Sequence, residues 1–507
     1  MILLTTSRFF TRLRFLFPVL ILFLASAEPV NAQATNCASQ GVSSSTTGSV
    51  TWTPQWCQEF NATTAGPPDT TVWTFDLGGG GWGNGEAEVY CGPPGTMSNP
   101  SPCPTMFSTT TNTVYLDGSG HLVIQPINIS GTWISTRMKT QGITNFSYGR
   151  IEGRIQLPDT TNQGLWPAFW SLGTSIGSGT PWPNCGEADI MEDWSPSVFN
   201  SPGPNGNRAT IHTAVTAGPG KGALFTFPSG QQANTAFHTY GVIWSANLMQ
   251  YYVDDPTKPF FIVTPGDLSP NDTWPFNASI FLITNVAVGG TLGGSTTSLV
   301  NPQPMMFDYM RQYTPSTVPA PSLGNPPSIT VKAGATYGNT STFTPSLTAG
   351  TGFVYLSCST NAPKSSCALS TNDLLNAHVV NSSPTGGPET VTVTITTTTN
   401  AMVPPLLNLP NLRLWLPVAI LGILLLALAF VLRKVRPAWR PACVLAGFIL
   451  AVALIAGCGG GYGGGYTPPP PSGGTTPGGY QITVDAFTES NTSGNADAST
   501  QITLTVN

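Results

Sequence analysis

The chain has 507 residues and a formal net charge of −5, and only 8% of its residues are charged, whereas Gly (55) and Pro (47) are abundant. This length exceeds that of one compact domain, and the composition favours short strands and turns over long charged helices. No basic block lies outside the apolar segments, so a nucleic-acid partner is not expected.

The first 32 residues have the pattern of an export signal. A basic region with three arginines precedes an apolar core from Phe15 to Ala25, and Val30-Asn31-Ala32 offers a small-x-small cleavage site. The core is too short for a comfortable membrane span. The polar segment that follows, residues 33–49, favours cleavage over an uncleaved anchor helix.

Residues 50–313 hold nearly all the Trp and most of the acidic residues of the chain. Turn residues separate the strand-like runs of this region, which include Tyr148–Leu157, Thr239–Trp244, Gln250–Val253 and Ser279–Thr284. No long segment repeats its apolar residues with the period of an amphipathic helix. The predicted fold class is therefore all-β, with one large sandwich of two sheets packed face to face.

The residues beyond this region divide by composition. Residues 314–327 are rich in Pro and Ser, which is typical of a linker. Residues 328–400 are Thr-rich with clean alternation, and they predict a small immunoglobulin-like β-sandwich in preference to a disordered stalk. Residues 459–479 form a Gly/Pro linker, and residues 480–507 contain two alternating runs that predict a β-hairpin too small for an independent domain.

Two apolar runs predict contact with a membrane. Residues 414–432 are long enough to span a bilayer as a helix, and residues 442–457 form a shorter second run. The second run is either a second span or a lipoprotein-like signal that would make Cys458 lipid-bearing. Four basic residues lie between the runs, so the positive-inside rule places that loop in the cytoplasm and both flanks outside, in agreement with the export signal.

The nine cysteines fit an exported protein. Three pairs suit loop-closing disulfides, although sequence alone leaves the connectivity open. These pairs are Cys37 with Cys57, Cys91 with Cys103, and Cys358 with Cys367, which leaves Cys185 as the odd thiol. No spacing of Cys or His indicates a zinc site.

Three carboxylates gather in Glu187-Ala-Asp-Ile-Met-Glu192. In a regular strand Glu187 and Asp189 share a face, and a β-bulge near Ile190-Met191 would bring Glu192 to the same face. Neighbouring acids push their pKa values apart, which lets two carboxylates take different roles in glycoside hydrolysis. The apolar Ile190 and Met191 argue against a solvated edge strand, and the absence of Asp/Asn/Gly loop spacing argues against a calcium site.

Aromatic residues surround these acids: Leu165–Trp170 lies upstream, and Trp182 and Trp194 bracket the cluster. Flat indole rings offer sugar faces a large contact area. The cluster resembles the Glu-x-Asp-x-x-Glu signature of glycoside hydrolase family 16, in its laminarinase-like branch. Supporting segments occur in that family's order, namely Trp73–Glu86, Thr140–Gly142, Phe146–Glu152, Gly164–Gly173, Phe237–Trp244, Asn285–Gly290 and Phe307–Arg311.

The resemblance implies a β-jelly-roll sandwich and a retaining endo-hydrolase of β-1,3- or β-1,3-1,4-glucan that requires no cofactor for catalysis. By motif position, Glu187 would be the nucleophile, Asp189 the carboxylate that tunes it, and Glu192 the general acid/base. The residues that would contact sugar are Asn84, Arg137, Trp166, Trp170, Trp182 and His212. Some members bind a structural calcium away from the cleft, and the resemblance suggests Glu59 and Asp308 as its candidate ligands.

Two departures from the family pattern leave the substrate linkage open. Ala188 stands where Ile or Leu is usual, and His212 lacks the fuller His-rich pattern of many laminarinases. The alternatives are the same mechanism on a galactan such as agar, and a non-catalytic glucan-binding protein of the cell surface. The presence of both Glu187 and Glu192 favours catalysis. The sequence as a whole predicts an exported polysaccharide hydrolase held at a bacterial membrane.

Overall fold

The computed structural model describes residues 37–507 except 48–49, 216–219, 270, 301, 319, 335–339, 344–352, 371–378, 382–390 and 399–473. The predicted export signal and both apolar runs, residues 414–432 and 442–457, lie outside the described residues. Within the described part of the chain, no helix has the length and apolar character needed to span a bilayer.

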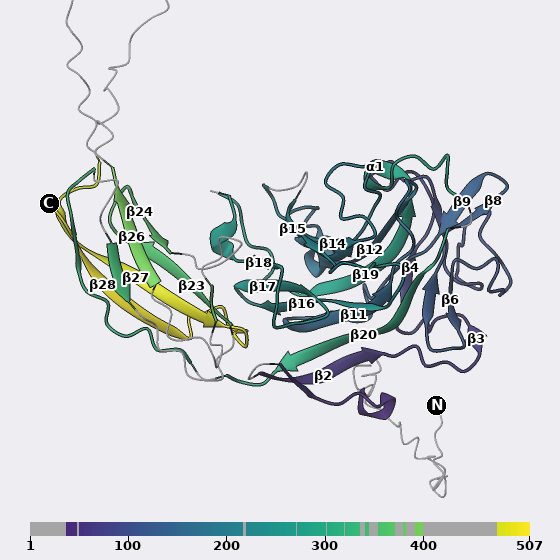
Figure 1. Cartoon of the computed structure of the whole chain (residues 1–507), viewed down its shortest axis with the longest axis horizontal. Helices are drawn as coiled ribbons and strands as arrows, with labels where there is room; N and C mark the ends of the chain where they lie inside the picture. Colours follow the sequence, from purple (N-terminus) through teal and green to yellow (C-terminus); the bar gives the residue numbers. More distant parts are fainter. Residues whose placement is uncertain are drawn as a thin grey trace, which may run out of the picture.

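The larger body is a sandwich of two antiparallel sheets, which Figure 1 shows stacked with β11, β20 and β2 below β12, β14 and β19. In sheet order, the outer sheet contains β18 (Phe261–Val263), β17 (Leu248–Val253), β16 (His238–Ser245), β11 (Gly149–Gln156), β20 (Met305–Pro315), β7 (Leu122–Ile124), β6 (Val114–Asp117) and β3 (Ala65–Gly66), with β2 (Val50–Gln58) on β20 and β1 (Ser45–Thr47) on β2. The inner sheet contains β15 (Lys221–Thr226), β14 (Gly206–His212), β13 (Glu187–Glu192), β12 (Leu165–Gly173), β19 (Ile280–Val288), β10 (Arg137–Lys139) and β4 (Thr74–Asp76). The predicted all-β class is confirmed.

Short elements complete this body. A small sheet contains β5 (Val89–Tyr90), β9 (Thr132–Ser135) and β8 (Ile127–Ile129), and the helical turns are η1 (Cys37–Gln40), η2 (Thr174–Ser178), η3 (Pro265–Asp267) and α1 (Gly290–Gly293). The main hydrophobic core lies between the two large sheets and includes Phe169 of β12 and Phe307 of β20. All nine residues of β19 are buried, because this strand is central in its sheet, and each fully buried large apolar side chain contributes about 1.5–3 kcal/mol.

The three predicted cysteine pairs are confirmed as disulfides, and Cys185 is free and buried. The Cys37–Cys57 disulfide and the pairing of β1 with β2 attach the start of the described chain to the outer sheet. The N-terminal segment predicted to end at residue 49 is therefore part of the sandwich, at least from Cys37 onward.

The C-terminal module is a second, smaller sandwich with its own core. One sheet has the order β21 (Ile329–Val331), β28 (Ala498–Val506), β27 (Gly478–Thr488), β23 (Phe353–Thr360) and β25 (Val379–Asn381), and the other has β22 (Thr340–Phe343), β26 (Val391–Thr397) and β24 (Ser365–Leu369). A sandwich was predicted here, and its immunoglobulin-like topology stays a prediction.

The predicted boundary at residue 400 is wrong, because the C-terminal hairpin belongs to this module. β27 pairs with β23, and β28 pairs with β21, so the hairpin lies inside the five-stranded sheet. An isolated hairpin is at best marginally stable, whereas here Ile482 and Leu504 are fully buried in the module's core. The chain between Thr398 and Thr475 is thus an insertion into a folded module.

The two residues that flank this insertion, Thr398 and Thr475, lie side by side. The Thr475 backbone N–H donates to the Thr398 carbonyl oxygen at 3.0 Å, and the Thr398 N–H donates to the Thr475 hydroxyl at 3.1 Å. Any structure formed between these residues therefore starts and finishes on the same side of the module.

Candidate active site

A β-bulge in β13 places the three acids on one face of the inner sheet. The pairs between β13 and β14 are Glu187 with His212, Asp189 with Thr210, and Glu192 with Arg208. Ile190 and Met191 therefore oppose the single residue Ala209, which is the pattern of a β-bulge. Ile190 and Met191 are both buried in the main core, and Glu192 returns to the face of the other two acids. The bulge predicted from the sequence is confirmed.

Glu187 lies at the start of β13 and is partly buried. Its Oε2 accepts a hydrogen bond from Trp182 Nε1 at 2.5 Å. Burial raises the pKa of Glu187 well above its usual range, and the negative charge of Asp189 raises it further, whereas His212 and the indole N–H oppose the rise. The indole contact therefore stabilises the ionised form, which is the nucleophilic form.

Asp189 lies between the two glutamates and is only 3% exposed. His212 Nε2 is 3.3 Å from Asp189 Oδ2. Burial raises the pKa of Asp189 well above its usual range, and the charge of Glu192 adds to the rise. Ligand atoms of Glu187, Asp189 and His212 all lie within 4.8 Å of one another, so the three side chains form one compact polar cluster.

Glu192 is 8% exposed, and its Oε1 accepts a hydrogen bond from Trp166 Nε1 at 3.0 Å. Burial raises the pKa of Glu192, while His212, Trp166 and Arg208 oppose the rise. A carboxyl group with a raised pKa stays protonated to higher pH and can act as an acid. The Trp166 contact also fixes the direction in which this carboxyl points.

A second network lies beside the acids, because Trp170 is the cross-strand partner of Asp189. The guanidinium of Arg137 lies 4.8 Å from the ring centroid of Trp170 and 5.3 Å from that of Trp82. Its Nε is 3.0 Å from Asp76 Oδ2. Two cation–π contacts and an ion pair therefore hold Arg137 in place.

Hydrogen bonds extend this network to Asn84. Trp170 Nε1 donates to Asn285 Oδ1 at 2.8 Å, and Asn285 Nδ2 donates to the Tyr90 hydroxyl at 3.1 Å. Tyr90 donates to Glu86 Oε2 at 2.8 Å, and Asn84 Nδ2 donates to Glu86 Oε1 at 3.0 Å. The exposed Asn84 is thus tied through buried groups to the tryptophan beside the acids.

The structure places all nine residues predicted for catalysis and sugar contact in these two networks. Sequence reasoning missed Glu86, Tyr90, Asn285, Thr210 and Arg208 as supporting residues. Glu86 is the last residue of one segment that resembles the family, and Asn285 is the first residue of another. The resemblance could therefore have indicated both residues. Arg208 gave no such signal, since its place opposite Glu192 depends on the pairing of β13 with β14.

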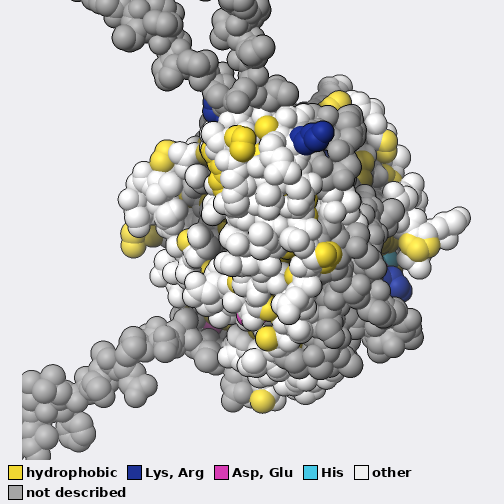
Figure 2. Space-filling view, turned by 90° about the vertical axis from the view of Figure 1, so that its left-hand side faces the viewer, with side chains coloured by type: hydrophobic (Ala, Val, Ile, Leu, Met, Phe, Trp, Pro, Cys, Tyr) yellow, Lys and Arg dark blue, Asp and Glu magenta, His cyan; other side chains and the backbone are white. Residues whose placement is uncertain are grey.

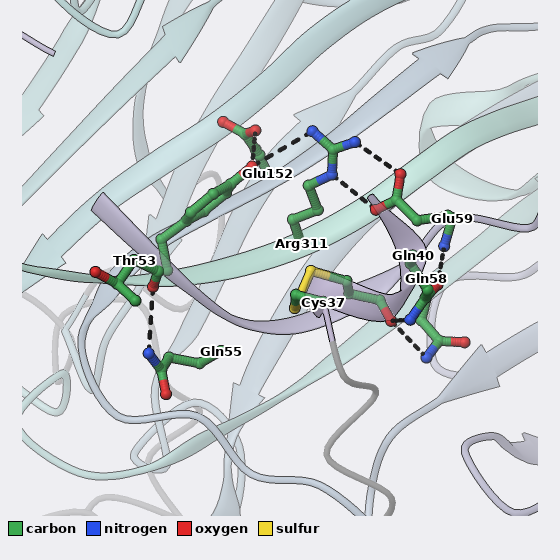
Figure 3. Close-up of a disulfide and its surroundings, with 10 residues drawn as sticks. Cys37, Gln40, Thr53, Gln55, Gln58, Glu59, Glu152 and Arg311 are labelled. Atoms are coloured by element: carbon green, nitrogen blue, oxygen red, sulfur yellow. Dashed lines mark hydrogen bonds and ion pairs between the residues drawn. A yellow bond between two sulfur atoms is a disulfide. The ribbon is translucent and has the colours of Figure 1, made fainter. Parts of the chain in front are cut away.

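Glu59 and Asp308 do not fit the calcium site suggested for them. Arg311 donates to both carboxylate oxygens of Glu59, at 2.8 and 2.7 Å (Figure 3). Arg154 donates to Asp308 Oδ2 at 2.6 Å. A cation beside either carboxylate would meet a guanidinium that already neutralises it. In the described part of the chain, the group of His, Cys, Asp or Glu side chains close enough to share a metal ion is Glu187, Asp189 and His212.

Comparison with known proteins identifies the family. The sequence model of "Glycosyl hydrolases family 16" matches residues 105–290. A beta-glucanase from Rhodothermus marinus is 31% identical over 276 residues, which cover 52% of this chain and 85% of that protein. The chain belongs to glycosyl hydrolase family 16.

Other similar proteins cover the same part of the chain. A glucan endo-1,3-beta-glucosidase from Cryptopygus antarcticus is 31% identical over 254 residues, which cover 48% of this chain and 83% of that protein. An X-ray structure of endo-beta-1,3-glucanase from Pyrococcus furiosus shows 29% identity and a TM-score of 0.45, covering 54% of this chain and 99% of that one. The residues that the family model matches lie in the larger body, which has the jelly-roll fold of the family, and the C-terminal module lies outside them.

Insertion of one alanine after Met191 should abolish most activity. A one-residue slip reverses the face of the residues that follow it, so Glu192 would turn toward the core. General acid/base help contributes about 10²–10⁴-fold, and we therefore expect kcat to fall by at least about 100-fold. Met191→Leu keeps both spacing and volume and should remain close to the parent. Parent-like turnover of a folded insertion variant would show that strand register does not position Glu192.

Asp189→Asn should shift the acid limb of the kcat/KM pH profile to lower pH. The charge of Asp189 raises the pKa of Glu187, and a nucleophilic carboxylate must be ionised. Removing that charge lowers the pKa, so Glu187 ionises at lower pH. Asp193→Asn is the matched control, because this buried carboxyl accepts from Thr160 at 2.6 Å and is absent from the groups that shift Glu187. An acid limb that stays in place in Asp189→Asn would contradict the coupling.

Proposed function

We propose that this family 16 chain hydrolyses β-1,3- or β-1,3-1,4-linked glucan by cutting within the polymer. The observation that carries the proposal is the alignment of Glu187, Asp189 and Glu192 on one face of β13, with an indole N–H on each glutamate. The similar proteins from Rhodothermus marinus and Cryptopygus antarcticus are a beta-glucanase and a glucan endo-1,3-beta-glucosidase. Their names supply the substrate class.

The proposed mechanism retains the anomeric configuration. Glu187 attacks the anomeric carbon while Glu192 protonates the leaving oxygen, and Glu192 then removes a proton from the water that hydrolyses the glycosyl-enzyme. Retaining enzymes hold their two carboxyl groups about 5–5.5 Å apart, a spacing that suits acids from one short strand segment. Burial raises the pKa of Glu192, which favours the protonated form that the first step needs.

The remaining predicted residues bind the sugar in this proposal. Trp182 is 45% exposed and donates to Glu187, so its ring can receive a sugar face beside the nucleophile. Arg137, fixed between two indole rings, and Asn84, fixed by Glu86, present polar groups on the neighbouring side. Apolar ring contacts give area, and the fixed polar groups give orientation.

Reducing-sugar release from laminarin, lichenan and agarose tests the substrate. We expect release from laminarin or lichenan and none from agarose, with products that first appear as the β-anomer by NMR. Glu187→Gln should abolish turnover while the folded protein still binds glucan. Release from agarose alone would indicate a galactanase, and binding without release in the parent would indicate a glucan-binding protein. Either result would overturn the proposal.

We also propose that the protein is exported and anchored in a bacterial membrane. Two adjacent spans joined by a basic cytoplasmic loop must enter and leave the membrane on the same side. The hydrogen bonds between Thr398 and Thr475 support this topology, because they hold both ends of the insertion at one point of the module. The jelly roll and the module then lie together outside the cytoplasm.

Cysteine labelling of intact cells tests this topology. A cysteine at Lys434, in the basic loop, should resist a membrane-impermeant maleimide until the cells are opened. A cysteine at Gln501, exposed on β28, should react in intact cells. The parent protein measures the background from native thiols. Reaction at position 434 in intact cells would contradict the model, as would protection at position 501.

A further inference from the structure

The C-terminal module covers the outer face of the jelly roll at the β17–β18 edge. Leu248 and Ile262 of that edge pack against Tyr355 and Phe487 of the module. The two aromatic rings are stacked with centroids 5.6 Å apart, and none of the four side chains is more than 9% exposed. An uncovered edge with these apolar groups would be an aggregation risk, so the module shields it.

Polar contacts give this contact surface a defined geometry. Gln250 Nε2 donates to Glu489 Oε1 at 2.8 Å. Gln250 is fully buried, and Glu489 is only 5% exposed. The Ala246 backbone N–H donates to the Asn491 carbonyl oxygen at 3.0 Å. Buried polar groups are costly unless their hydrogen bonds are made. Sliding of one body on the other would break these bonds.

The module's far side differs from this contact surface. Figure 2 views the molecule from the module's end, and its hydrophobic side chains are scattered there among polar ones. Among the described residues of the module, Tyr355, Phe487 and Glu489 direct apolar and hydrogen-bonding contacts at the jelly roll. We call this side of the module its docking face.

This docking face also contacts the segment that begins at η3. A Cβ atom on Gly266 would lie 3.1 Å from the Tyr355 hydroxyl oxygen, so Tyr355 lies directly on the turn. Thr264, the residue before η3, hydrogen-bonds with both Tyr355 and Asp267. Lys221 of β15 donates to the Asp267 carbonyl oxygen at 3.0 Å. The module thus contacts a turn that holds the edge strand of the inner sheet.

The same segment continues to the catalytic residues. Asp272 Oδ2 accepts from Thr213 Oγ1 at 2.5 Å, and Thr213 directly follows His212. A Cβ on Gly186 would lie 2.7 Å from Pro275 Cγ, so Pro275 packs against the residue that precedes Glu187. Residues 264–269 and 271–276 therefore connect the docked module to both strands, β13 and β14, at the end of their pairing where Glu187 lies opposite His212.

We propose that the C-terminal module is part of the catalytic unit. The module docks on the β17–β18 edge and positions the side of the cleft that contains Glu187 and His212. Tyr355 and Phe487 are its positioning residues. This inference rests on the proposed function of Glu187, but the docking itself does not. Its consequence is that the cleft keeps a fixed orientation relative to the module.

Hydrogen–deuterium exchange on the full-length protein, with kinetics beside it, tests this inference. Phe487→Ala should speed amide exchange in residues 264–276 and in residues 212–215, and it should lower kcat by at least about threefold, since misplacement by about 1 Å can cost up to about 10²-fold. Phe487→Leu should restore most of both properties. Tyr480→Ala, on the same strand but away from the jelly roll, is the matched control and should change neither.

The exchange readout separates this inference from the substrate proposal, because it needs no turnover. Unchanged exchange in residues 264–276 of folded Phe487→Ala would overturn the docking role, whatever the substrate. Faster exchange with unchanged kcat would overturn the positioning role. If Phe487→Ala does not fold, Tyr355→Phe decides, since it removes only the hydroxyl that lies on Gly266. Parent-like exchange and kcat in that variant would then count against the inference.

Discussion

The site depends on one irregularity, the bulge at Ile190 and Met191. These two residues bury their side chains in the main core, and the energy of that burial holds the extra residue in the strand. Because the core packs against the bulge, Glu192 stays on the cleft face of the sheet, where it pairs with Arg208 of β14. The Trp166 contact to Glu192 then follows from strand pairing, since Trp166 lies on the neighbouring strand β12, whereas Trp182 reaches Glu187 from the loop before β13.

Burial acts on all three acids in the same direction. It is the first cause of their raised pKa values, and an indole N–H on each glutamate opposes the rise. Position separates the two glutamates: Glu187 lies at the start of β13 beside the exposed Trp182, whereas Glu192 is buried beside Trp166. A site of this kind needs rigid walls, because buried charge is tolerated only where donors stay in place. The segment shared with the C-terminal module supplies part of that rigidity.

The resemblance to the family made the three acids predictable, since they belong to one local motif, Glu187–Glu192. It did not reveal that Glu59 and Asp308 pair with arginines, because these partners are far away in the sequence. Arg208 and Thr210 were also missed, because their importance depends on which strand pairs with β13. Residues that act through a cross-strand neighbour leave no local pattern, so only the register could reveal them.

The sequence by itself determined the all-β class and the bulge, and it suggested three cysteine pairs whose connectivity the structure then fixed. Each follows from short-range regularities, namely the two-residue period of a strand and the short loops between cysteines. The tertiary structure alone decided that β27 and β28 complete a module begun at β21, and that this module docks on the jelly roll. An alternating pattern shows that a strand must bury one face, but the partner that covers it is selected by long-range packing.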